Sequence, residues 1–78
     1  MTLADLKPGD RVRIQAIQTA PTSVQRLMIM GFVEGAELQF VGASLGGDPL
    51  EFLLHGGAVS LRQADARHFE VNRESGSG

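Results

Sequence analysis

Five short segments in which polar and apolar residues alternate place the strongest constraint on how this chain folds. They cover residues 11–17, 37–41, 50–54, 59–61 and 69–71, and turns rich in glycine or proline separate them. Alternation with a period of two is typical of strands that bury one face. We therefore predict a mainly β domain, a small closed or nearly closed five-stranded barrel with one short helix.

The apolar residues of these segments share one face of each strand, which predicts the core. In the first segment Val12, Ile14 and Ala16 are expected to point inward. The chain has four phenylalanines and neither tyrosine nor tryptophan, so aliphatic side chains must fill most of the interior. The residues expected in the core are Phe40, Phe52, Phe69, Val12, Ile14, Leu27, Leu38, Leu54, Leu61 and Val71.

The one helix is expected over residues 23–30. Thr22 and Gln25 match the spacing of a capping box, in which the two side chains bond free amides at the start of a helix. Gly31 is suited to the left-handed residue that ends a helix, and the apolar Phe32 after it can pack back on the last turn. Such a short helix is not stable alone in water, so it must dock on the strands.

The helix carries four consecutive apolar residues, 27–30, which cannot all face one core. Successive helical residues point about 100° apart. Whether Met28 or Met30 belongs to the buried face stays open, but Ile29 points outward in both cases. Arg26 lies on the same outer side. We therefore predict a partner-binding surface formed by Arg26, Ile29 and Met28.

Length and charge exclude several classes of protein. The chain has 78 residues, no cysteine and a net charge of −2, with seven scattered basic residues. A nucleic-acid binder would gather its basic side chains on one surface. No apolar run approaches the length that inserts in a bilayer, and no secretion signal is evident. We expect one domain over residues 1–73, a flexible tail over residues 74–78, and a cytoplasmic location.

No set of reactive side chains stands out, so we predict no catalytic, cofactor-binding or metal-binding residue. The two histidines, His55 and His68, have only scattered carboxylates near them in sequence. A metal site needs several converging ligands, and weak binding of a divalent metal stays open. The serines lack histidine and aspartate at a recognisable spacing. An enzyme is therefore not expected.

Several short motifs follow one another along the chain in a definite order. They are Leu3 and Leu6; Pro8, Gly9 and Asp10; Arg26, Leu27, Met30, Gly31, Phe32 and Gly35; Gly47, Asp48 and Pro49; Leu61 and Arg62; and Asp65 and Ala66. Together they resemble the FeoA family, small cytoplasmic proteins of bacterial ferrous iron uptake. The resemblance spans residues 3–72.

The resemblance implies an SH3-like barrel and a partner, the G-domain of the FeoB-type membrane GTPase. It leaves open whether the chain activates, inhibits or scaffolds that GTPase, and whether it forms a homo-oligomer. The family offers no settled catalytic or metal residues to assign here. The alternative is a regulatory domain that senses iron, related to the SH3-like domain of DtxR-type repressors, with His55 or His68 as a ligand.

Overall fold

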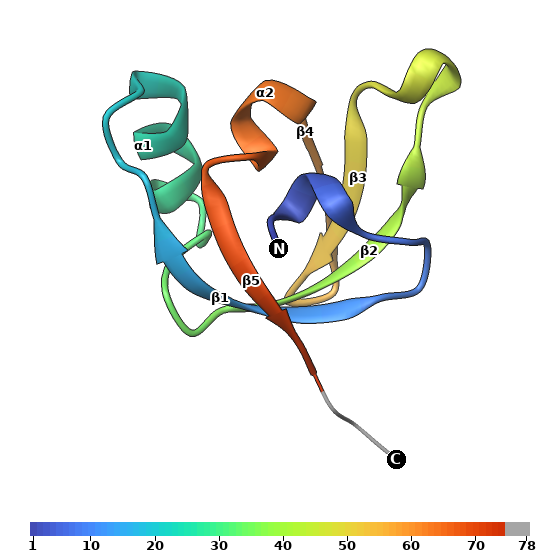
Figure 1. Ribbon diagram of the computed structural model, residues 1–78, viewed down its shortest axis with the longest axis horizontal. Coiled ribbons are helices and arrows are strands. Elements are labelled where there is room, and N and C mark those ends of the chain that lie inside the picture. Colours follow the sequence, from blue (N-terminus) through green and yellow to red (C-terminus); the bar gives the residue numbers. More distant parts are fainter. Residues whose placement is uncertain (75–78) are drawn as a thin grey trace.

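The computed structural model describes residues 1–74 and confirms a mainly β domain (Figure 1). In chain order its elements are η1 (Leu3–Asp5), β1 (Arg11–Ile17), α1 (Thr22–Ile29), β2 (Glu37–Ala43), η2 (Leu45–Gly47), β3 (Leu50–Leu54), β4 (Gly57–Leu61), α2 (Gln63–Ala66) and β5 (Phe69–Arg73). Within these residues, no helix combines the length and the apolarity needed to cross a membrane.

The described strands form one antiparallel sheet of five strands in the order β4-β3-β2-β1-β5. The two end strands, β4 and β5, do not pair with each other, so backbone hydrogen bonds do not close the barrel. The N-terminus partly covers the outer edge of β5. Its Met1 carbonyl accepts a 2.9 Å hydrogen bond from the Val71 amide, and Thr2 forms an isolated bridge with Glu70.

The core contains the residues that the sequence predicts for it, together with several others. All ten residues expected there are buried, including Phe40, Phe52 and Phe69. Phe32 joins them and contacts Phe69 edge to face, with ring centroids 5.8 Å apart. Phe40 and Phe52 lie opposite each other on β2 and β3, with centroids 5.2 Å apart. The four aromatic side chains therefore form two contacting pairs within one core.

The expectation that Ala16 points inward is wrong. The pairing of β1 with β5 shifts between Ile14 and Ala16, which marks a β-bulge. An extra residue in a strand reverses the inward and outward faces beyond it. Ala16 is consequently exposed, while Ile17 is half-buried and packs against the core.

The start of α1 also differs from the prediction. The helix begins at Thr22, and its N-cap is Pro21, which has no side-chain hydrogen bond to the helix. Thr22 and Gln25 therefore do not form a capping box; the Gln25 amide donates instead to the Thr19 carbonyl at 3.0 Å. A capping box does occur in the structure, but at η1, between Thr2 and Asp5.

The end of α1 confirms the prediction for Gly31. Its φ of 118° lies where a residue with a Cβ is strained. The Gly31 amide donates to the Met28 carbonyl at 3.0 Å, and the Phe32 amide donates to the Leu27 carbonyl at 3.1 Å. This pair of bonds is the Schellman motif, and it turns Phe32 directly into the core.

The expected flexible tail begins at Glu74, whose backbone amide donates to the Arg11 carbonyl at 2.8 Å. The Glu74 carboxylate lies 3.0 Å from the Arg13 guanidinium, which also pairs with Glu37 at 2.6 Å. The rest of that expected tail, residues 75–78, lies outside the described residues.

Candidate partner-binding surface

The orientation of α1 decides which side chains the helix offers to a partner. Val24 and Leu27 are buried, and Met28 is half-buried and packs against the core. Figure 1 shows α1 at one side of the molecule, beside the end of β1. With that face docked, the opposite face of the helix is left to solvent.

Three apolar side chains are exposed in the short segment that ends α1 and leads away from it. Ile29 is 86% exposed, Met30 is 56% exposed and Val33 is 42% exposed. The exposed Arg26 precedes Ile29 by three positions and Met30 by four, the spacings at which helical residues are surface neighbours. We call Arg26, Ile29, Met30 and Val33 the helix-end patch.

Arg26 and Ile29 are both exposed, as the helix geometry predicted, and their part in binding a partner stays a prediction. Met28 differs, since it faces the core, and Met30 takes the exposed place. The sequence contained a signal for this choice. Val24, Leu27 and Met28 are spaced i, i+3 and i+4, which is the pattern of a buried helical stripe.

The Schellman motif holds the patch in a fixed position. The chain turns at Gly31, between Met30 and Val33, and the Val33 amide donates to the Gly31 carbonyl at 2.9 Å. The buried Phe32 lies between the exposed members of the patch. A preformed apolar surface loses little conformational entropy on binding, which favours affinity. The arrangement is therefore suited to contact with another protein.

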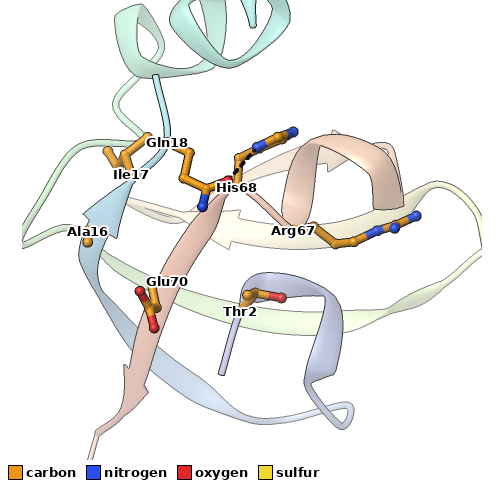
Figure 2. Close-up of a pocket in the computed structure, with 7 residues that line it drawn as sticks. All are labelled: Thr2, Ala16, Ile17, Gln18, Arg67, His68 and Glu70. Atoms are coloured by element: carbon orange, nitrogen blue, oxygen red, sulfur yellow. Dashed lines mark hydrogen bonds between the residues drawn. The ribbon is translucent and has the colours of Figure 1, made fainter. Parts of the chain in front are cut away.

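A second candidate site is a shallow hollow of about 220 Å³ (Figure 2). Its charged side chains do not converge: Figure 2 shows the Arg67 guanidinium and the Glu70 carboxylate apart from each other. The Gln18 side-chain oxygen lies 3.1 Å from Nδ1 of His68. The Thr2 hydroxyl is already engaged in the cap of η1. The hollow thus brings together no nucleophile with a base, and no set of charges around one point.

The two histidines lie in different parts of the fold. His55 occupies the turn between β3 and β4 at a φ of 53°, and His68 lies between α2 and β5. Over residues 1–74, no three histidine, aspartate or glutamate side chains are grouped so that they could hold a metal ion.

One side-chain hydrogen bond joins the two α-helices. The Ser23 hydroxyl of α1 donates to the Asp65 carboxylate of α2 at 2.7 Å.

The clearest electrostatic effect in the domain is at Asp10, far from the helix-end patch in sequence. Its carboxylate accepts hydrogen bonds from the Lys7 backbone amide at 2.8 Å and from the Arg73 guanidinium at 3.1 Å. These two bonds, the Lys7 bond foremost, lower the pKa of Asp10 below its ordinary value. The carboxylate thereby joins the turn before β1 to the end of β5, which is a structural role.

Comparisons with known proteins agree with the fold and point to one family. The model of the FeoA domain family matches residues 1–73. The solution structure of FeoA from Chlorobium tepidum is 32% identical, with a TM-score of 0.88, and the match covers 100% of this chain and 74% of that one. Zinc-complexed FeoA from Stenotrophomonas maltophilia, described as a prokaryotic SH3 domain protein, is 28% identical with a TM-score of 0.79, covering 92% and 89%. The SH3-like fold is thus confirmed.

More distant neighbours share the fold alone. The manganese regulator SloR superposes with a TM-score of 0.77 at 13% identity, and this chain covers 34% of its length. Identity at this level carries no inference about metal sensing. A comparison with curated proteins finds no match.

Proposed function

Because the chain belongs to the FeoA family, we propose that it is a cytoplasmic accessory protein of ferrous iron uptake that binds the G-domain of a FeoB-type membrane GTPase. The match of the family model over residues 1–73 supports a role in iron uptake. The exposed apolar side chains at the end of α1 support a role in binding. The chain acts, in this proposal, by contact with the GTPase and not by catalysis.

The observation that carries the binding proposal is the exposure of Ile29 on a helix whose other face is docked. An aliphatic side chain at the centre of an interface loses its contact with water, and such a residue contributes about 1–3 kcal/mol to binding. Met30 and Val33 are further exposed apolar side chains within four residues of it along the chain. Arg26 adds a positive charge beside the patch, which suits an acidic or carbonyl-rich surface on the GTPase.

The test is isothermal titration of the chain against the FeoB-type G-domain of the same organism, loaded with GDP or with a non-hydrolysable GTP analogue. Ile29→Glu should weaken binding by about 1–3 kcal/mol, because it places a charge in the contact. The matched control is Leu45→Glu. Leu45 is also a highly exposed aliphatic side chain, but it lies on η2, in a different part of the sequence.

The three outcomes are distinct. Loss of binding by Ile29→Glu alone supports both the partner and the helix-end patch. If both variants bind the G-domain as tightly as the unaltered chain, the GTPase remains the partner but the helix-end patch lies outside the interface. If the unaltered chain does not bind the G-domain in either nucleotide state, the proposed function itself is wrong.

A further inference from the structure

The outer edge of β4 carries main-chain groups with no partner. His55 and Gly56 form a two-residue turn, which makes Leu54 and Gly57 a hydrogen-bonded pair of the hairpin. Hydrogen-bonded and non-hydrogen-bonded pairs alternate along an antiparallel ladder. Ala58 and Ser60 therefore belong to the non-bonded pairs, and their N–H and C=O groups point away from β3.

Nothing else in residues 1–74 bonds to these groups. No backbone or side-chain hydrogen bond reaches the main chain of Ala58 or Ser60, and both residues are exposed. The other edge strand is treated differently, since Met1 and Thr2 pair along β5. The sheet thus has one covered edge and one free edge.

The free edge also lacks the features that normally prevent strands from pairing. Natural edge strands are commonly protected by charged residues, by proline or by a bulge. β4 has the sequence Gly-Ala-Val-Ser-Leu, and its register with β3 is regular throughout. Because Ala58 and Ser60 are also exposed, a second strand can reach the outward-facing groups of β4.

We propose that β4 pairs with β4 of a second copy of this chain, in an antiparallel arrangement across a twofold axis. A twofold interface brings one surface against itself, so the surface must tolerate its own image. β4 does so because it has no charged side chain that would face a like charge. Ala58 and Ser60 each present one outward-facing N–H and one outward-facing C=O. Two antiparallel copies of β4 can therefore bond all of these groups to each other.

The register that fits these groups centres on Val59. Ala58 then lies opposite Ser60 of the second copy, and these two residues exchange both of their backbone hydrogen bonds. Val59 lies opposite its own image at a non-hydrogen-bonded position, where side chains approach most closely. Val59 is half-buried and packs against the core, so this contact covers its remaining exposed area.

The residues that flank β4 are compatible with this register. Arg62 follows the strand and lies 3.5 Å from the Asp48 carboxylate. In the register centred on Val59, Arg62 lies opposite Gly56 of the second copy. The two Arg62 side chains therefore do not face each other. The interface uses neither Ile29 nor Arg26, and the inference does not depend on the proposed function.

The direct test measures amide hydrogen exchange and sedimentation of the unaltered chain from micromolar to millimolar concentration. A dimer should form as concentration rises, and the amides of Ala58 and Ser60 should slow by about tenfold or more. The Val59 amide points toward β3 and provides an internal reference that is protected at every concentration. A chain that stays monomeric, or that dimerises without slowing these two amides, overturns the proposal.

Charge variants test the register. The chain with Ala58→Lys and Ser60→Lys should be monomeric, as should the chain with Ala58→Glu and Ser60→Glu, since like charges then face each other. Mixing the two should restore dimers. Gln15→Lys with Ala20→Lys adds the same charge at exposed positions off the edge and should leave dimerisation unchanged. Protection of Ala58 and Ser60 that arises only on adding the G-domain would mean that a strand of the GTPase, not a second copy, occupies the edge.

Discussion

Gly31 lies directly against Leu54, so that a Cβ atom on Gly31 would be only 3.1 Å from Cδ2 of Leu54. This contact joins the end of α1 to the end of β3. Glycine is favoured here for two reasons: a residue with a Cβ is strained at a φ of 118°, and a Cβ would crowd the Leu54 side chain, which would have to shift by a few tenths of an ångström.

Gly31→Ala should therefore lower the free energy of unfolding by about 1–3 kcal/mol. Urea denaturation measures the change. Gly9→Ala separates the two causes, because Gly9 has a φ of 95° but open space around it, and it should cost less. Gly42→Ala, with neither constraint, should stay within about 0.5 kcal/mol of the parent. Equal stabilities of the Gly31 and Gly42 variants would show that the cap is not strained.

Phe52→Ala should cost about 3–5 kcal/mol, because Phe52 is fully buried and packs against Phe40. Domains are stable by about 5–15 kcal/mol, and a small one lies near the lower limit, so the variant should lose most of its stability at 37 °C. Near-ultraviolet circular dichroism and resistance to protease measure this. Phe52→Leu keeps most of the volume and should retain the fold. A fully folded Phe52→Ala variant would contradict the packing described.

The phase of α1 can be tested with Met28 in its last turn and Met30 at its C-cap. Met28→Ala should lower the free energy of unfolding by about 1–2 kcal/mol, because the half-buried Met28 side chain packs against the core. Met30→Ala should change it by less than about 0.5 kcal/mol, because Met30 is mostly exposed. Thermal unfolding followed by circular dichroism distinguishes them. The opposite ranking would mean that the helix is rotated relative to the sheet.

Asp10 should contribute to stability only above strongly acidic pH. Its pKa is lower in the folded chain than the ordinary value of 3.8, so the ionised carboxylate favours folding. That contribution is complete at pH values above this ordinary pKa and is lost as the pH falls through the lower folded pKa. Urea denaturation of the parent and of Asp10→Asn should therefore differ near neutral pH and converge in acid. A difference that stays constant with pH would exclude this linkage.

The strands, the core and the end of the helix could be predicted from the sequence because they follow from local patterns. Alternation along each strand selects the inward face, which is why Phe40, Phe52 and Phe69 were predicted to be buried and are. A glycine after a helical segment and before an apolar residue is enough to predict the cap at Gly31, because few other residues adopt that φ.

Tertiary structure decided what local patterns leave open. The bulge that turns Ala16 outward arises from the pairing of β1 with β5, which are distant in sequence. Met28 is covered and Met30 exposed because the docking of α1 selects one of two faces that its sequence permits. The free edge of β4 exists because β5 lies at the other end of the sheet and the N-terminus covers only that end. Local alternation makes a strand, but neighbours far along the chain decide which of its atoms remain available for binding.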